Sequence, residues 1–172
     1  MLCPNCGTYN LQGNEICSNC GQPLTSLDVP TPENPIERSL MENTVSTLYP
    51  ASPVTASPDT LIPDAIQQLL DNDIGALLVV DDDDKLLGIF SERDLLKKIA
   101  GLEPEYAERT IGEFMTPNPE VVSPSDLLCF ALHKMDIGGY RHLPVVDNGN
   151  PVGVVSVRDM LRHIMGLSDE SE

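Results

Sequence analysis

Two stretches of this chain repeat one pattern, and the repeat constrains the fold more than any other feature of the sequence. Leu77–Asp81 is followed by Gly88–Asp94, and Leu143–Asp147 is followed in the same way by Gly153–Asp159. The copies are offset by 66 residues before their turns and by 65 after them. Unbroken apolar runs are typical of strands buried on both faces. Because two units are too few for a solenoid, we expect a pseudo-twofold pair.

Each copy is interpreted as a short strand, a helix, two strands and a second helix. The expected short strands are Val54-Thr55 and Val121-Val122, the first helices are about 59–71 and 125–136, and the last helices are about 92–100 and 157–165. The first helices should begin just after Ser57-Pro58 and Ser123-Pro124, and the last should end at Gly101 and Gly166 as C-caps. The sequence therefore predicts an α/β (α+β) fold of two β-α-β-β-α repeats, 44–102 and 103–167, with an acidic tail at 168–172.

Small residues and a cysteine lie inside the first helices. Ala65 and Ala131 should permit close packing at mid-helix, and Cys129 is interpreted as a buried structural thiol. The run Asp81–Asp84 is interpreted as a solvated hairpin turn and not as a cation site, because side chains around a hairpin diverge.

The last helix of each repeat is expected to begin with a serine N-cap. Ser91 is followed three residues later by Asp94, and Ser156 by Asp159, which is an acidic variant of the capping box. A hydroxyl, a carboxylate and free backbone N–H groups converge there, as a ribose-phosphate ligand would require. A single Ser-x-x-Asp is usually only a cap, but its duplication in the same context favours the ligand interpretation.

Four of the five cysteines lie within residues 1–22, with the spacing C-x2-C-x10-C-x2-C. In a reducing cytoplasm this spacing predicts a four-thiolate structural zinc site of Cys3, Cys6, Cys17 and Cys20. About 22 residues cannot bury a stable core, so the metal would supply the folding energy. Redox C-x-x-C turns or disulfides are the alternative, which no surrounding βαβ pattern supports. The pattern resembles a zinc ribbon, and proline-rich residues 23–43 are expected to form a semi-extended linker.

Composition and charge argue against several classes of function. The net charge of −17 repels nucleic acid and anionic membranes, and residues 1–37 contain no Lys or Arg. There is no apolar run of 18 residues and no secretory pattern at the N-terminus, so we expect a cytoplasmic protein without a membrane partner. The sequence lacks G-x-G-x-x-G, a P-loop and G-x-S-x-G, and nothing proposes a nucleophile with its base, so we do not expect an enzyme.

Residues 44–167 resemble tandem CBS domains, the pair called a Bateman module. The resemblance rests on Gly-x-x-Ser-x-x-Asp in both repeats together with Phe114–Pro117, Val121–Pro124 and Arg141–Asp147. It implies regulatory binding of an adenosine-containing ligand such as AMP, ADP or ATP, and sometimes S-adenosylmethionine or a dinucleotide, in clefts between the repeats. It also implies a homodimer that signals to a protein partner not yet identified.

The resemblance assigns roles to individual residues. In the second repeat, Ser156 and Asp159 match the ribose site, Arg141 and His142 match the basic pair facing phosphates, and the apolar walls around adenine are Val121, Val122, Leu143 and Pro144. In the first repeat the corresponding residues are Thr55, Ala56, Ser91 and Asp94.

Several of these residues have a second interpretation. Arg141 could pair with a surface carboxylate, His142 could be an ordinary half-buried histidine, and Arg158 is either a phosphate ligand or a member of a helix-surface ion pair. The first repeat has Gly75-Ala76 where the second has Arg141-His142. We therefore predict that AMP or ATP binds mainly at the cleft built on Asp159.

Three functions remain open at this point. The leading hypothesis is a ligand-sensing regulatory module. The alternatives are a nucleic-acid-binding adaptor, in which the ribbon reads nucleic acid and the repeats form a scaffold, and a structural dimer with vestigial clefts.

Overall fold

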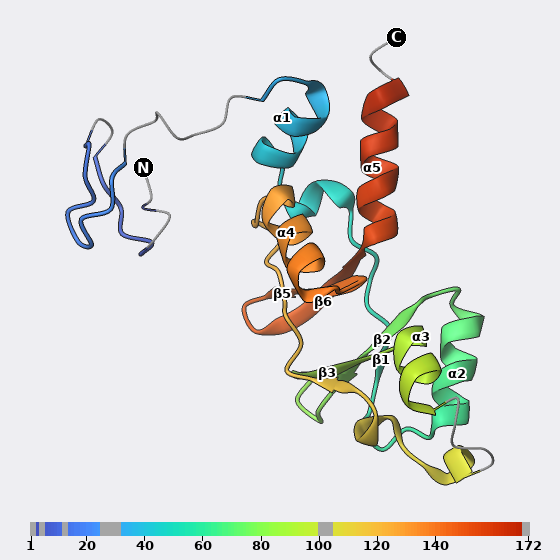
Figure 1. The fold of residues 1–172 in the computed structure, drawn as a ribbon. Coiled ribbons are helices and arrows are strands. Elements are labelled where there is room, and N and C mark those ends of the chain that lie inside the picture. Colours follow the sequence, from blue (N-terminus) through green and yellow to red (C-terminus); the bar gives the residue numbers. More distant parts are fainter. Residues whose placement is uncertain (1–2, 4–5, 12–13, 25–31, 100–104, 170–172) are drawn as a thin grey trace. The chain divides into compact units, whose positions relative to one another are not determined.

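The structure is a computed structural model that describes residues 3, 6–11, 14–24, 32–99 and 105–169 (Figure 1). The chain divides into two units, Met1–Glu33 and Asn34–Glu172. The cap expected at Gly101 and the last three residues of the acidic tail lie outside the described residues. Within those residues, no helix is both long and apolar enough to cross a bilayer.

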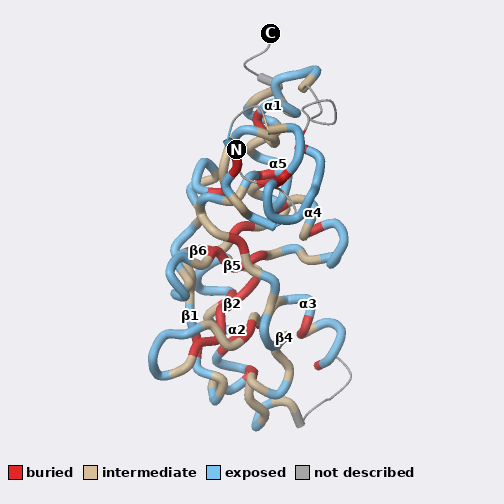
Figure 2. Tube along the Cα trace, turned by 90° about the vertical axis from the view of Figure 1, so that its left-hand side faces the viewer, coloured by how far each residue is buried: buried red, intermediate tan, exposed pale blue. Residues whose placement is uncertain are grey.

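The first repeat contains a four-stranded sheet in the order β1 (Thr55–Ala56), β2 (Ala76–Val80), β3 (Leu86–Ser91) and β4 (Thr116–Pro117). β1 is parallel to β2, and the other two pairs are antiparallel. All five residues of β2 are buried, as the unbroken apolar run predicts (Figure 2). α2 (Ile62–Asp71) precedes the hairpin, and α3 (Glu92–Asp94) follows it and continues into a π-helical turn, Leu95–Ile99.

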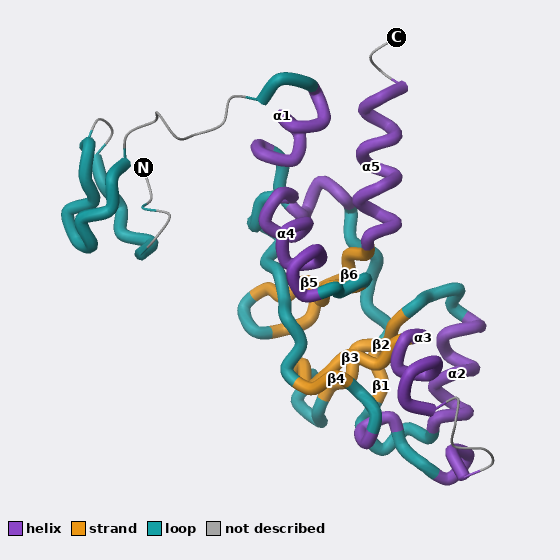
Figure 3. The backbone as a smooth tube through the Cα atoms, viewed as in Figure 1, coloured by secondary structure: helices purple, strands orange, loops and turns teal. Residues whose placement is uncertain are grey.

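The second repeat contains the antiparallel hairpin of β5 (His142–Asp147) and β6 (Asn150–Ser156). α4 (Leu128–Gly138) precedes the hairpin and α5 (Val157–Asp169) follows it (Figure 3). The short strand expected at Val121-Val122 is reduced to one bridge, in which Val122 pairs in parallel with Val145. The predicted β-α-β-β-α order is therefore present twice, with a weaker first strand in the second copy.

The two repeats exchange their leading segments. Val45 is completely buried in the hydrophobic cluster of the second repeat, whereas Ile111 is completely buried in that of the first. The backbone follows the same exchange, because the N–H of Ile62 donates to the carbonyl of Arg109 at 3.0 Å and that of Leu128 to the carbonyl of Asn43 at 2.9 Å. Each core is thus completed by chain that precedes the other repeat, and the two repeats interlock.

These exchanged contacts correct the expected starts of the first helices. The structure begins them at Ile62 and Leu128 and not directly after the Ser-Pro pairs. The intervening residues form turns, in which Thr60 N–H donates to the Ser57 carbonyl and Asp126 N–H to the Ser123 carbonyl. The first helical N–H groups find their acceptors in the exchanged segments, and this fixes where the helices begin.

Three further expectations are wrong. Gly166 is not a C-cap, because α5 continues through it to Asp169, and Gly166 is absent from the glycines with positive φ. The extended linker is wrong over Pro35–Glu42, which forms α1 with Asn34 as its N-cap. Cys129 is exposed, because the buried side of α4 is formed by Leu128, Ala131 and Met135, and Cys129 is rotated away from that side.

Candidate functional site

The four cysteines of the N-terminal unit form one cluster. Their sulfur atoms all lie within 4.8 Å of one another, and the Cys3–Cys20 and Cys6–Cys17 pairs are each 3.6 Å apart. A tetrahedral zinc site with Zn–S bonds of about 2.3 Å has sulfur–sulfur edges of about 3.8 Å. The cluster therefore fits a zinc ion in both donor type and spacing.

Two equivalent turns build this cluster. Gly7 N–H donates to the Cys3 carbonyl at 2.9 Å, and Gly21 N–H donates to the Cys17 carbonyl at 3.0 Å. Both glycines adopt left-handed conformations, with φ of 69° and 72°, which only glycine adopts at little cost. Each C-x-x-C-G sequence thus folds back so that its two sulfurs lie on the same side.

The surroundings of the sulfurs favour thiolates. Hydrogen bonding with Thr8 lowers the pKa of Cys6 to about 5, and backbone N–H groups of Cys20 and Asn19 lower the pKa of Cys17. Asn10, which is 2% exposed, lies between the two turns: its amide donates toward Cys17 Sγ at 3.5 Å, and its oxygen accepts from Ser18 N–H at 2.9 Å. The cysteine spacing gave no signal for this asparagine.

In the second unit, both Ser-x-x-Asp sequences form the expected capping boxes. Asp94 Oδ2 accepts from the Ser91 N–H at 3.0 Å and from its hydroxyl at 2.8 Å. Asp159 Oδ2 accepts from the same groups of Ser156 at 2.8 and 2.6 Å. In each repeat the cap uses one carboxylate oxygen, so ligand binding depends on what surrounds the other.

The second oxygen differs between the repeats. Asp94 Oδ1 lies 2.8 Å from Lys98 Nζ, and the Asp94 side chain is only 9% exposed. Asp159 Oδ1 lies 3.5 Å from Arg162 Nη1, and the Asp159 side chain is 33% exposed. The carboxylate of the second repeat is therefore more exposed and more loosely paired than that of the first, so it can accept another hydrogen bond more readily.

Cationic groups gather beside Asp159. His142 pairs with Ser156 across β5 and β6, and the Arg141 carbonyl accepts from the N–H of Val157 at 3.0 Å. The Arg141 and Arg158 side chains are exposed, and neither forms an ion pair among the residues that the structure describes. Both guanidinium groups are therefore available to an anion at the start of α5.

His142 is half-buried among these charges. Burial lowers the pKa of His142, the carboxylates of Glu92 and Asp159 act to raise it, and Arg141 and Arg158 act to lower it further. Glu92 belongs to the other repeat, so the ring lies where the two repeats meet. The sequence pattern gave no reason to single out Glu92.

The expected adenine walls have three different surroundings. Val122, Leu143 and Ala56 are buried in the hydrophobic clusters and Pro144 is buried in β5, so their side chains belong to the packing of the repeats. Thr55 is exposed at the start of β1. Val121 alone among the expected ligand residues lines a cavity between the two repeats.

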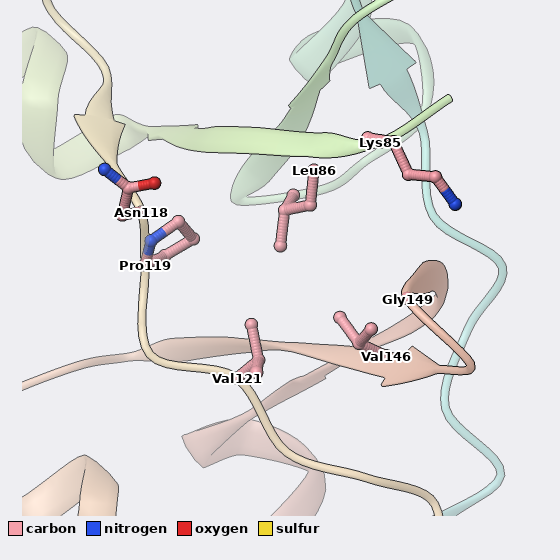
Figure 4. A pocket seen from close by; sticks show the side chains of 7 residues that line it. All are labelled: Lys85, Leu86, Asn118, Pro119, Val121, Val146 and Gly149. Carbon is pink, nitrogen blue, oxygen red and sulfur yellow. The ribbon is translucent and has the colours of Figure 1, made fainter. Parts of the chain in front are cut away.

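A cavity of about 310 Å³ lies between β3 of the first repeat and β5 of the second, near the hairpin turns (Figure 4). Leu86 points from one side toward Val121 and Val146 on the other. The cavity is also lined by Lys85, Asn118, Pro119 and Gly149. Of these lining residues, only Val121 was expected at a ligand site from the sequence pattern.

Family comparisons agree with this geometry. The CBS domain family matches residues 45–101 and 111–166, and the zinc-ribbon domain family matches residues 2–24. CBS domain-containing protein CBSCBSPB1 of Arabidopsis thaliana is 32% identical over 120 residues, which is 70% of this chain. The chain spans only 22% of the length of that relative.

Solved structures share the fold of the repeated unit. CBSX2 in complex with AMP is 28% identical, with a TM-score of 0.62 over 73% of this chain and 98% of that one. The CBS domain pair of protein MJ0100, in complex with 5-methylthioadenosine and S-adenosyl-L-methionine, is 29% identical, with a TM-score of 0.66 over 72% of this chain and 97% of that one. The chain thus belongs to the CBS-domain family, as a tandem pair preceded by an N-terminal zinc-ribbon domain.

Proposed function

We propose that the CBS pair is a regulatory sensor that binds an adenosine-containing ligand of the AMP, ADP or ATP class at Asp159. The observation that carries the proposal is a partly exposed carboxylate at the start of α5, in a repeat where Arg141 and Arg158 are exposed and form no ion pair within the described part of the chain. Structures of related pairs with AMP and with S-adenosylmethionine support the ligand class. No role in chemical catalysis is required of these residues.

Each group has a distinct task in this proposal. Asp159 Oδ1 accepts a ribose hydroxyl, while Oδ2 continues to cap α5 through Ser156. Arg141 and Arg158 compensate the phosphate charge, which would otherwise face an unfavourable field in a chain of net charge −17.

The cavity lined by Val121 and Val146 lies away from this ribose site. Asp159 caps Ser156, which pairs with His142, whereas Val146 lies about 13 Å further along β5 at about 3.3 Å per residue. Because adenine is bonded directly to the ribose, a ligand held at Asp159 does not place its base in this cavity.

The proposal is tested by titration calorimetry with AMP, ATP and 5-methylthioadenosine on the wild-type chain and on Asp159→Ala. Losing a charge-assisted hydrogen bond worth roughly 1.5–3 kcal/mol should weaken AMP binding by on the order of tenfold to a hundredfold. Asp94→Ala is the matched control and should change AMP affinity much less. If Asp94→Ala abolishes binding and Asp159→Ala leaves it unchanged, the assignment is wrong; if no ligand binds, the clefts are vestigial.

Ligand binding can regulate this protein only if the CBS pair has two arrangements that differ in their affinity for the ligand. α5 is the element through which a change at Asp159 could reach α1, because His163 Nε2 of α5 lies 2.7 Å from the Ser39 hydroxyl of α1. We propose that a protein partner reads this change from the ribbon or the surface of the CBS pair.

We propose that the ribbon holds one structural zinc ion per chain at the four cysteines. Metal analysis of freshly purified protein should give one equivalent, with all four thiols protected from alkylation. Chelation should unfold the ribbon but leave the CBS pair folded, since the pair forms its own unit with separate hydrophobic clusters. Substoichiometric zinc with freely alkylated cysteines would refute the assignment.

We also propose a homodimer. Large apolar side chains are exposed at equivalent positions of the two repeats, namely Leu61 and Leu127, both 40% exposed, and Leu96 and Leu161, at 76% and 55%. A symmetric partner would cover these residues in pairs. Light scattering at micromolar concentration should give twice the chain mass, and a monomer both with and without nucleotide counts against the dimer.

A further inference from the structure

The ring of His142 lies against the backbone of the other repeat. A Cβ atom placed on Gly75 would be 2.9 Å from both Cε1 and Nε2 of this ring, and 3.4 Å from an oxygen of Glu92. Gly75 occupies the position that Arg141 holds in the second repeat. The missing side chain in the first repeat is thus what allows the imidazole to approach the start of α3.

The charged groups around this ring come from both repeats. Glu92 is the first residue of α3, Asp159 lies in the first turn of α5, and the charges of Arg141 and Arg158 act on the ring from its own repeat. Arg93 is directed elsewhere, because its Nη1 donates to the Gly139 carbonyl at 2.6 Å. Since burial lowers the pKa of His142 below 6.5, the ring is mainly neutral at pH 7 without ligand.

We propose that His142 takes up a proton when a phosphorylated ligand binds, so that pH decides how strongly this site prefers phosphorylated over uncharged adenosine ligands. The inference rests on the proposed function and adds a charge-dependent selectivity to it. A phosphate monoester carries a charge of about −1.5 to −2 at pH 7. Beside the half-buried ring, this charge favours the imidazolium form much as the adjacent carboxylates do.

The sign of the pH dependence follows from linkage. The complex binds more protons than the free protein, so AMP affinity should fall as pH rises, by up to about tenfold per pH unit between the pKa of free and that of bound His142. A ligand without a phosphate gives no such stabilisation and should bind with little pH dependence. Raising the pH therefore shifts the preference from AMP toward 5-methylthioadenosine.

The experiment measures proton uptake directly. AMP and 5-methylthioadenosine are titrated into the full chain by calorimetry at pH 7 and pH 8, above the second pKa of about 6 of the phosphate itself. Each titration is repeated in two phosphate-free buffers of different ionisation enthalpy. For AMP the observed enthalpy should change with the buffer, corresponding to uptake of up to about one proton at pH 7, and for 5-methylthioadenosine it should not.

Two histidine substitutions assign the proton. His142→Gln retains a hydrogen-bonding side chain but cannot titrate. The proton uptake that accompanies AMP binding should therefore disappear, and the AMP affinity should become nearly independent of pH. His133→Gln replaces an exposed histidine of α4 and should behave like the wild type.

AMP binding without proton uptake, or with uptake retained in His142→Gln, overturns the inference and leaves the proposed function standing. Binding of 5-methylthioadenosine without AMP also overturns it. If neither ligand binds at any pH, the proposed function fails as well.

Discussion

The two repeats share one capping box but use its carboxylate differently. In the first repeat, Asp94 is enclosed between Ser91 and Lys98, and α3 becomes a π-helical turn after three residues. In the second, Asp159 is partly exposed at the start of the 13-residue helix α5. The same motif can therefore serve mainly stability in one place and remain open to a ligand in another.

The arginines near the two capping boxes also differ in how far other contacts occupy them. Arg93 of the first repeat donates to the carbonyl of Gly139, whereas the equivalent Arg158 has no ion-pair partner among the described residues. Gly75 provides no side chain where Arg141 provides a guanidinium. Structural contacts thus occupy the arginine of the first repeat, whereas the two arginines of the second repeat form no ion pair within the described part of the chain.

The largest expected difference between the repeats is in how much stability each core loses when an equivalent buried side chain is truncated. Phe90 and Val155 occupy equivalent positions, and both are 0% exposed. Phe90→Ala should lower the free energy of unfolding by about 3–5 kcal/mol. Val155→Ala should cost about 2 kcal/mol, because it removes only two methyl-sized groups. Urea denaturation followed by circular dichroism measures both, and equal losses would show that the cores do not differ as the side chains suggest.

Alanine substitutions of the two capping carboxylates should rank in one order for the loss of stability and in the opposite order for the loss of AMP affinity. Asp94→Ala removes two hydrogen bonds and leaves Lys98 without its buried partner, so we expect a loss of about 2–3 kcal/mol. Asp159→Ala removes a similar cap from a more exposed place and should cost about 1 kcal/mol. The same variants should rank the other way in AMP affinity. If one of the two variants lost more of both stability and AMP affinity than the other, the two carboxylates would not differ in role between the repeats.

Much of this asymmetry could be predicted from the sequence. The repeat, with its offsets of 66 and 65, identified both hairpins and both Ser-x-x-Asp caps, because strand burial and capping are local properties. The mid-helix alanines are buried as expected, with Ala65 and Ala131 both 0% exposed. The spacing of the cysteines was sufficient to predict their cluster, since each turn requires only its own five residues.

What could not be predicted depends on contacts between distant segments. The exchange of Val45 and Ile111 sets the starts of α2 and α4, and no local pattern encodes it. The contact of His142 with Gly75 was also missed, because it requires knowing how the repeats face each other. Cys129 was assigned to the wrong side of α4, since that helix is apolar on more than one side and its exposed residues include Phe130.

Filling the space at Gly75 should weaken the link between the repeats. A Cβ atom at this position meets the His142 ring at 2.9 Å, so Gly75→Ala must displace the imidazole from Glu92. We expect AMP affinity to fall by roughly threefold to tenfold, which corresponds to about 1 kcal/mol. Calorimetry measures the affinity, and circular dichroism checks the fold. Unchanged affinity and unchanged pH dependence would show that the position of the ring does not matter for binding.

The smallest expected effect concerns the length of α5, the element that most distinguishes the second repeat. Gly166 lies within this helix, and a Cβ atom added to it would meet nothing within 4 Å. In a helix interior, alanine is more favourable than glycine by about 0.8–1 kcal/mol, so Gly166→Ala should raise the free energy of unfolding by up to that amount. If Gly166 were instead a left-handed cap, as the sequence first suggested, the same substitution would destabilise the protein by a comparable amount. The sign of the change in urea denaturation therefore decides whether α5 continues past Gly166.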